Sequence, residues 1–383
     1  MVNNIAYFDN AATTFPKPEN VYVTMDKFYR ECGVNIGRGQ HKLSSMANAL
    51  MEQTRDKILN LFHCSNKQVV FTHTATEALN LILFGLNMPK GAVVYFSPFE
   101  HNSVTRALNH LVKTQEIQAI QLAANKDKLQ LDFSEIQVQF GQVAPDYIVI
   151  SHASNVCGTI APVEAILSLG KRYQATTIVD MCQTAGLIDI DLSSDIYDFA
   201  VFEGHKTLYG PMGIGGFVMK KTVELSPLIY GGTGVESANQ DMPTSFPAKY
   251  EAGSHNIQAI AGLNASLTWI NQTGINTIHD VEQSNREILI SLLTKYSNLK
   301  MYMPSDGIGV VSCTFDGYSS DSIGQVLSEK NIAVRTGLQC SPFAHKLMGT
   351  FPSGTVRFSV SYFNNDEDFV VLREALDYIE YNS

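Results

Sequence analysis

The sequence is poor in positive charge. Its 383 residues include 27 Lys and Arg against 37 Asp and Glu, which gives a formal net charge of −10. This balance argues against binding to nucleic acid or to an anionic membrane surface. The apolar runs are far too short to cross a bilayer, and no charged n-region followed by an apolar h-region opens the chain. We therefore expect no nucleic-acid partner, no membrane partner and a cytoplasmic location.

Cysteine is also scarce, and its spacing excludes two kinds of site. The six cysteines form no Cys-x-x-Cys pair and show no spacing typical of a metal site. In a chain of this length they indicate reduced thiols rather than a disulfide framework, and we expect no metal. Hydrophobic residues make up 45% of the chain, which is enough for a sizeable core.

One lysine stands out in the segment VFEGHKTLYGPMGIGGFVM, residues 201–219. Lys206 lies between a short apolar run and a glycine-rich run. A phosphate-binding P-loop is excluded because this segment contains no Gly-Lys pair. A lysine at the end of a buried strand is costly to desolvate, so Lys206 is either a functional amine or an exposed lysine in a turn.

Short apolar runs alternate with helical patterns through the first two thirds of the chain. Strands are expected at 68–72, 92–97, 147–152, 176–180 and 198–204. Because these strands are nearly all apolar, they favour a parallel sheet covered on both faces. The alternation with helices predicts an α/β, doubly wound domain.

The pattern changes after about residue 255. Helical patterns and strand-like runs then follow in a new order: helices at 256–271 and 280–296, strands at 299–303 and 308–315, a helix at 320–329, a short strand, and a closing helix at 366–381. This order predicts a smaller C-terminal α+β domain. The expected division is an N-terminal segment (1–15) that packs with the small domain, a large domain (16–255) and the small domain (256–383).

Polar residues follow the expected strands, at the edge where open α/β sheets bind ligands. Thr74 and Thr76 open a helix, where free backbone N–H groups and hydroxyls either hold a phosphate or simply cap the helix. His101 opens another helix, where its imidazole either stacks on a planar ring or only caps and packs. Each of these signals is weak when it is taken alone.

The remaining strand ends complete a set. Asn155, Asp180 and Gln183 follow two strands, and Lys206 follows the next one. An aspartate at the end of an apolar strand must be paired or solvated. A phosphate site, a stacking imidazole, an amide, a carboxylate and a lysine are together what pyridoxal 5'-phosphate needs, with the lysine as the Schiff-base residue and the aspartate at the ring nitrogen. The sequence therefore predicts this cofactor.

Over nearly its whole length the chain resembles the class V, fold-type I aminotransferase family, and within it the group-II (SufS-like) cysteine desulfurases. The segments that carry the resemblance are YFDNAATT (7–14), GRGQHKLS (37–44), GHKTLYGPMGIG (204–215), GGTG (231–234), VRTGLQC (334–340) and GTVRFSVSYFN (354–364). The lysine segment and the Arg-x-Gly-x-x-Cys motif are specific when they occur together.

The resemblance implies a homodimeric enzyme that converts L-cysteine to L-alanine and takes the sulfur as a persulfide on Cys340, for transfer to a possible sulfur-acceptor protein. It implies that Lys206 holds the cofactor and moves the Cα proton, with His101 also at the reacting centre. The other implied contacts are Asp180 at the ring nitrogen; Gln183 and Asn155 near the 3-oxygen; Thr74, Ala75, Thr76 and His205 at the phosphate, with Thr233 arriving from the other subunit; and Arg357 at the substrate carboxylate, with Asn155, Arg38 and His41 also near the substrate.

The chain departs from the family pattern near the lysine. Glu203 stands where the family usually has Ser or Thr, and its charge should repel a phosphate unless the side chain turns away or a neighbour neutralises it. Met181 and Cys182 replace residues that are usually small.

The segment around Cys340 is punctuated by glycine and proline, which favours an exposed loop over burial of this cysteine. Arg335 precedes Cys340 in the sequence, and His345 and Lys346 follow it. These cations would favour a Cys340 thiolate if they lie close to its sulfur.

Several alternatives stay open at this point. The chain could be a selenocysteine lyase, a class V aminotransferase or another pyridoxal-phosphate lyase in which Cys340 is incidental. It could also be a non-catalytic sulfur-relay scaffold, which Glu203 alone favours and which Lys206 with Asp180 opposes.

Overall fold

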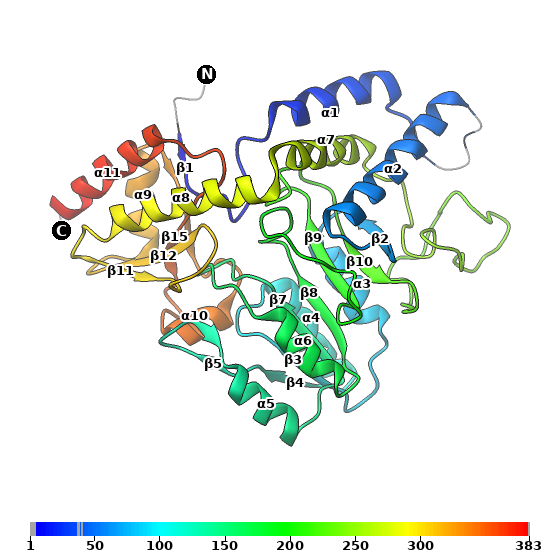
Figure 1. Ribbon diagram of the computed structural model, residues 1–383, viewed down its shortest axis with the longest axis horizontal. Helices are drawn as coiled ribbons and strands as arrows, with labels where there is room; N and C mark the ends of the chain where they lie inside the picture. Colours follow the sequence, from blue (N-terminus) through cyan, green and yellow to red (C-terminus); the bar gives the residue numbers. More distant parts are fainter. Residues whose placement is uncertain (1–4, 37–38, 40, 382–383) are drawn as a thin grey trace.

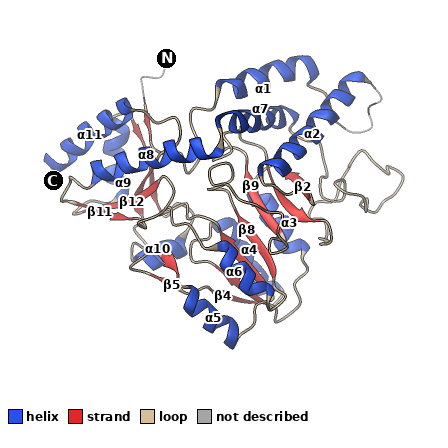
Figure 2. Cartoon of the chain, in the orientation of Figure 1, coloured by secondary structure: helices blue, strands red, loops and turns tan. Residues whose placement is uncertain are grey.

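Two β-sheets organise the protein (Figure 1, Figure 2). The computed structural model describes residues 5–36, 39 and 41–381. The larger sheet has seven strands, in the order β2 (Lys67–Thr72), β10 (Gly215–Lys220), β9 (Phe199–Glu203), β8 (Thr176–Asp180), β7 (Tyr147–Ser151), β3 (Val93–Phe96) and β4 (Gln118–Gln121). From β9 to β4 all neighbours are parallel, and only β10 runs against its two neighbours. The expected α/β class with a mostly parallel sheet is confirmed.

Strand β10 is a difference between the expected and the observed sheet. The glycine-rich run after Lys206 gave no strand signal, yet it forms a full strand between β2 and β9. Gly216 allows this close pairing, since a Cβ there would lie 2.3 Å from the Val70 carbonyl oxygen. One antiparallel strand therefore separates the end of β2 from the end of β9.

The strands of the large sheet alternate their apolar side chains between two helical layers. Val94 and Val149 lie in the core of one face, whereas their neighbours Tyr95 and Ile148 lie in the core of the other. The helices of the first face are α3 (Ala75–Gly85) and α4 (Asn102–Thr114), and those of the second are α2 (Lys42–Leu61), α5 (Phe133–Gln142) and α6 (Val163–Lys171). This double coverage explains why the strands are almost wholly apolar.

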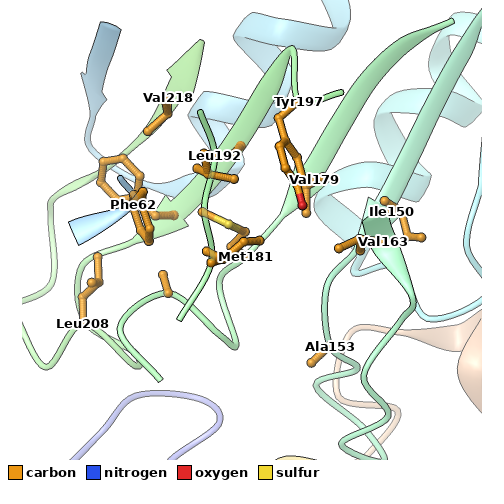
Figure 3. Packing of buried hydrophobic residues seen from close by; sticks show 14 of the residues in the cluster. Phe62, Ile150, Ala153, Val163, Val179, Met181, Leu192, Tyr197, Leu208 and Val218 are labelled. Carbon is orange, nitrogen blue, oxygen red and sulfur yellow. The ribbon is translucent and has the colours of Figure 1, made fainter. Parts of the chain in front are cut away.

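The second core layer also contains the residue that follows Asp180. Met181 is fully buried and lies among the core side chains close to Leu192 (Figure 3). The methionine that replaces a small family residue therefore fills the core instead of the sheet edge.

The C-terminal part forms a four-stranded antiparallel sheet with its own core. Its strands are, in order, β11 (Leu299–Tyr302), β12 (Val310–Phe315), β15 (Thr355–Ser359) and β14 (Arg335–Gly337). The helices α8 (Ile275–Leu293), α9 (Ser320–Glu329) and α11 (Asp366–Tyr381) contribute to this core (Figure 1). The expected helices at 320–329 and 366–381 match α9 and α11.

The N-terminal strand belongs to this second core. Strand β1 (Ala6–Tyr7) pairs in parallel with β13 (Ile332–Ala333). Phe8 is buried edge-on against Phe358 and Phe369, with ring centroids 6.4 and 5.6 Å apart. This pairing fixes the segment that follows, residues 9–14, between the two sheets.

Helix α7 (Ile257–Thr273) joins the two parts. It packs on α1 (Glu19–Cys32) and α2, two helices for which the sequence gave no clear pattern. The division of the chain at residues 15 and 255 stays a prediction. The other elements are α10 (Pro342–Met348), β5 (Ala124–Asn125) and β6 (Gln130–Leu131). Among the described helices, none combines the length and the hydrophobicity that crossing a membrane requires.

Candidate active site

A cavity of about 370 Å³ lies where the carboxyl ends of the large sheet meet the C-terminal sheet. Eleven of the predicted residues line this one cavity: Thr74, Ala75, Thr76, His101, Asn155, Asp180, Gln183, His205, Lys206, Cys340 and Arg357. They come from segments that are far apart in the sequence. In open α/β sheets, ligands bind beyond the carboxyl ends of the strands. The residues that were chosen because they follow strands lie together in this cavity, as this rule predicts.

Asp180 and Lys206 come from neighbouring strands. Asp180 ends β8, and its register partner Val201 lies in β9, two residues before Glu203. The Asp180 side chain is buried, and its Oδ1 accepts the backbone N–H of Cys182 at 2.9 Å. Among the described residues, no hydrogen-bond partner of the Lys206 amine is found. The cavity therefore holds a buried carboxylate and an amine that is free to react.

The N-terminus of α3 forms one end of the cavity. Thr74 caps the helix, since its hydroxyl accepts the backbone N–H of Glu77 at 3.2 Å. The backbone N–H of Ala75 donates to Glu203 Oε2 at 2.8 Å. The structure confirms that Thr74 caps the helix and shows that it lines the cavity at a helix N-terminus, where anions are favoured, while its contact with a phosphate stays a prediction.

Glu203 does not turn away from the cavity, and among the residues that the structure describes no cation is in contact with it. It lines the cavity and is 6% exposed. Burial, reinforced by Asp180, raises the pKa of its carboxyl to about 7, against the effects of the Ala75 N–H and Lys206. Its Oε1 has no hydrogen-bond partner among the described residues. His205 Nε2 lies 3.8 Å from this oxygen.

The two imidazoles of the cavity are neutral near pH 7. Burial, with Lys206 nearby, lowers the pKa of His101 to about 4 and that of His205 to about 4. His101 also caps α4, because its Nδ1 accepts the backbone N–H of Ser103 at 3.1 Å. The contact between His205 and Glu203 is therefore no ion pair.

The two amides are held in place by backbone groups. Gln183 donates to the Ala11 carbonyl at 2.9 Å. Asn155 donates to the Gln339 carbonyl at 2.8 Å and accepts from the Ser341 hydroxyl at 2.7 Å. Asn155 therefore fixes both sides of Cys340.

Cys340 lies in a short turn between β14 and α10 and is exposed, whereas the other five cysteines are buried. Its carbonyl accepts the backbone N–H of Asn102 at 2.7 Å, which ties the turn to the start of α4. Gln339 and Cys340 have φ of 40° and 58°, the left-handed region that side chains other than glycine rarely adopt. The contacts around the turn hold this strained backbone in place.

The expected cations around Cys340 are only partly present. Arg335 lines the same cavity. His345 is fully buried with a pKa lowered to about 4 by burial, and its Nε2 pairs with Gln339 Oε1 at 2.8 Å, so it is not a cation. The Lys346 ammonium lies over the rings of Phe343 and Phe351. The prediction was wrong for His345 because burial costs the charged imidazole its hydration.

Arg357 is buried and is held by two contacts. One of its terminal nitrogens donates to Asp9 Oδ1 at 2.7 Å, and the other donates to the Asn155 carbonyl at 2.9 Å. Arg335 pairs with the other oxygen of Asp9 at 2.8 Å. The Nε of Arg357 has no partner among the described residues. Two guanidinium groups on one carboxylate leave a net positive charge at this end of the cavity.

Sequence reasoning missed Asp9 and Gln339, and it did not place Arg335 in the cavity. Their positions depend on contacts between segments hundreds of residues apart, which no local pattern reveals. The signal that could have pointed to Asp9 is an acidic residue inside YFDNAATT, one of the segments that carry the family resemblance.

Cys182 also lines the cavity, two residues beyond Asp180. It is 7% exposed, and burial with the nearby Asp180 raises the pKa of its thiol well above the usual value. A thiol in this state is a poor nucleophile compared with an exposed one.

Two predicted residues lie outside this cavity, and a third is not described. Thr233 lies in the long segment between β10 and α7 and lines a separate groove with Arg55 and Glu251. His41 caps α2 by accepting the backbone N–H of Ser44 at 3.1 Å, and it does not line the cavity. Arg38 lies outside the described residues. Within the described part of the chain, no three His, Cys, Asp or Glu side chains are grouped to hold a metal ion.

The comparisons with known proteins identify the family of the chain. The family model described as Aminotransferase class-V matches residues 6–372, and the chain belongs to this family. A probable cysteine desulfurase of Methanothermobacter thermautotrophicus is 30% identical over 386 residues, which cover 99% of this chain and 96% of that protein. A cysteine desulfurase of Escherichia coli O127:H6 is 30% identical over 374 residues, which cover 95% of this chain and 90% of that protein.

Solved structures show the same fold. The apo structure of a cysteine desulfurase from Thermococcus onnurineus NA1 matches with a TM-score of 0.92 at 27% identity, covering 100% of this chain and 96% of that one. A cysteine desulfurase from Escherichia coli matches with a TM-score of 0.84 at 24% identity, covering 98% and 94%. The expected fold-type I architecture is confirmed.

Proposed function

We propose that this protein is a pyridoxal-phosphate-dependent cysteine desulfurase, which converts L-cysteine to L-alanine and takes the sulfur as a persulfide on Cys340. The observation that carries the proposal is the meeting of Lys206, Asp180, Arg357 and the exposed Cys340 in one cavity. The family and the relatives named cysteine desulfurase support it.

The residues of the cavity fit the cofactor. Lys206 offers an amine that has no hydrogen-bond partner in the described parts of the chain, and the buried Asp180 offers a carboxylate for the protonated ring nitrogen. The N-terminus of α3 offers a position for the phosphate, together with His205, whose Nδ1 is buried and unpartnered among the described residues. His101 would lie against the ring, with Asn155 and Gln183 near its 3-oxygen. Pyridoxal phosphate, when it is bound, delocalises the electron pair left at the substrate Cα.

The chain's own groups divide the remaining tasks. Arg357 would bind the substrate carboxylate, since its Nε is free and a guanidinium group pairs well with a carboxylate. Lys206 would accept the proton from Cα, as a general base within the cavity. Asp9 would position Arg357 by pairing with its far side.

Cys340 would act as the nucleophile in the sulfur transfer. Its thiolate attacks the substrate Sγ; an S–S bond forms while the substrate Cβ–S bond breaks, and the electron pair of that bond stays with carbon, which takes up a proton. The products are L-alanine and a persulfide on Cys340. Among the cysteines of the cavity, Cys340 suits this role because it is exposed, whereas Cys182 is buried with a raised pKa.

The proposed partners follow from the same reasoning. L-cysteine is the substrate, an acceptor protein removes the sulfur, and two subunits form a dimer in which Thr233 reaches the phosphate of the neighbouring site. Leu228, Ile229 and Tyr230 are exposed apolar residues just before Thr233, which supports an interface there. Size-exclusion chromatography with light scattering tests the dimer.

Product analysis tests the proposed activity. The purified protein, supplied with pyridoxal phosphate, is incubated with L-cysteine with and without a thiol reductant. We expect alanine in both cases, and sulfide to accumulate only with the reductant. Amino transfer to a keto acid without alanine from cysteine would favour the aminotransferase alternative, and activity on selenocysteine alone would favour the lyase.

A further inference from the structure

The N-terminus of α3 is already in contact with a carboxyl group. Glu203 Oε2 accepts the first backbone N–H of this 11-residue helix, that of Ala75, at 2.8 Å. Strand β10 crosses directly behind this contact, since a Cβ on Gly215 would lie 3.0 Å from Ala75 N. The position that favours an anion is therefore shared between Glu203 and any phosphate that enters the cavity.

The second oxygen of Glu203 indicates that the cavity binds a polar group. Glu203 is 94% shielded from solvent, lines the cavity, and its Oε1 has no hydrogen-bond partner among the described residues. A buried carboxyl oxygen without a partner is costly, and it gains a partner if a donor or acceptor group is bound in the cavity.

We propose that Glu203 must bind a proton before a phosphate monoester can be held at the N-terminus of α3, and that the protonated carboxyl then donates a hydrogen bond to the phosphate. This inference rests on the proposed function, because the phosphate monoester is that of pyridoxal phosphate. A serine or threonine hydroxyl donates at every pH, whereas a glutamic acid donates only while it is protonated.

Burial and the charged groups that face Glu203 place the pKa of its carboxyl at about 7, so its protonation changes near neutral pH. Lys206 and the neutral His205 lie in the same turn, Asp180 and Cys182 come from the end of β8, and α3 contributes only the Ala75 N–H. Burial raises the pKa of Glu203 to about 7, Asp180 acts in the same direction, and Lys206 opposes it. A phosphate dianion close by would raise this pKa further.

Proton linkage determines whether the affinity for pyridoxal phosphate rises or falls with pH. If the bound state holds one more proton than the free state, the affinity for the ligand falls as the pH rises above the pKa of the free carboxyl. Affinity for pyridoxal phosphate should therefore be highest near pH 6 and fall above pH 7. In a variant without this carboxyl, the affinity for pyridoxal phosphate should not show this additional decrease with rising pH.

The test compares cofactor affinity across pH in matched proteins. Pyridoxal phosphate is titrated into the apo-protein at pH 6, 7, 8 and 9, with binding followed by absorbance, for the wild type, Glu203→Gln, Glu203→Ser and the control Glu77→Gln. Glu77 is an acid in the first turn of the same helix, but it does not line the cavity. The protonation of the phosphate in solution is common to all four proteins and cancels in the comparison.

We expect the wild type and Glu77→Gln to lose affinity, relative to Glu203→Gln, by about 10-fold per pH unit above pH 7, which is the slope for one linked proton. Glu203→Ser should behave like Glu203→Gln. Parallel curves for the wild type and Glu203→Gln would overturn the inference.

A second measurement needs no variant. Calorimetry of the wild type at pH 8, in two buffers of different ionisation enthalpy, should show about one more proton taken up with pyridoxal phosphate than with pyridoxal, which lacks the phosphate. Equal uptake overturns the inference. A covalent link to Lys206 with parallel curves or equal uptake overturns this inference alone, whereas the absence of any link to Lys206 at every pH overturns the proposed function itself.

Discussion

The cavity has two walls that compensate their charges in different ways. The strand-end wall consists of residues 74–76, 101, 155, 180, 182, 183, 203, 205 and 206, and the C-terminal wall consists of residues 335, 339, 340 and 357. On the strand-end wall the imidazoles are neutral, the Lys206 amine has no partner within the described part of the chain, and the Glu203 carboxyl has a pKa of about 7. On the C-terminal wall both guanidinium groups already share Asp9.

This difference indicates how the two walls would work. The strand-end wall has unsatisfied groups at several points, which a bound cofactor would satisfy. The C-terminal wall is held by its own ion pairs and by the hydrogen bonds of Asn155, so it would present Arg357 and Cys340 in fixed positions. Changes to the first wall should therefore alter cofactor binding and spectrum, and changes to the second should alter substrate use only.

Lys206→Ala is expected to have the largest effect. Loss of the amine removes both the covalent link and the general base, so turnover should fall by about 10⁴-fold or more. Mass spectrometry after borohydride reduction should find the cofactor on the peptide with Lys206 in the wild type. Lys17→Ala is the control, because the Lys17 amine lies beside the His205 carbonyl at 2.6 Å and its pKa is lowered to about 7 by burial. Finding the cofactor on Lys17 would refute the assignment.

Asp180→Asn should have the next largest effect and still leave the fold intact. An amide fills the same volume but cannot hold the ring proton, so the rate should fall on the order of 100-fold or more. Steady-state kinetics and thermal unfolding separate the two effects. Near-native activity with an unchanged cofactor spectrum would contradict the role of Asp180.

Arg357→Lys tests the C-terminal wall and should have a smaller effect. The lysine keeps the charge but loses the planar donor pair, so KM for L-cysteine should rise by about 10- to 100-fold. The cofactor spectrum should not change. Arg335→Lys is the comparison, because the Arg335 side chain is 52% exposed and its loss should raise KM less. A larger effect at Arg335 would reverse the proposed division of tasks.

The sequence was informative for the strand-end wall because each residue there follows an apolar strand. Each signal was weak alone, and Asp180 and Lys206 were predicted because several consecutive strand ends carry polar or charged residues that should meet at one edge of the sheet. Strand β10 was not predictable from its glycine-rich segment, because it lies between its neighbour in sequence, β9, and the distant strand β2, with which no local pattern pairs it.

The C-terminal wall was predicted less completely. Arg357 and Cys340 were found through the family resemblance, but Asp9, which joins Arg357 to Arg335, depends on the parallel pairing of β1 with β13. The prediction that His345 is a cation was wrong because the sequence did not reveal that this side chain is buried. Its burial under the turn of Cys340 removes the charge that the sequence alone suggested.

The central claim is that the sulfur is transferred to Cys340 and not to the second cavity cysteine. The most direct measurement is persulfide labelling with peptide mapping after exposure to L-cysteine, in the wild type, Cys340→Ser and Cys182→Ser. The account predicts a label on Cys340 in the wild type and in Cys182→Ser, and none in Cys340→Ser, which should keep its cofactor spectrum. A label on Cys182 or on another cysteine, or sulfur release by Cys340→Ser at the wild-type rate, would contradict it.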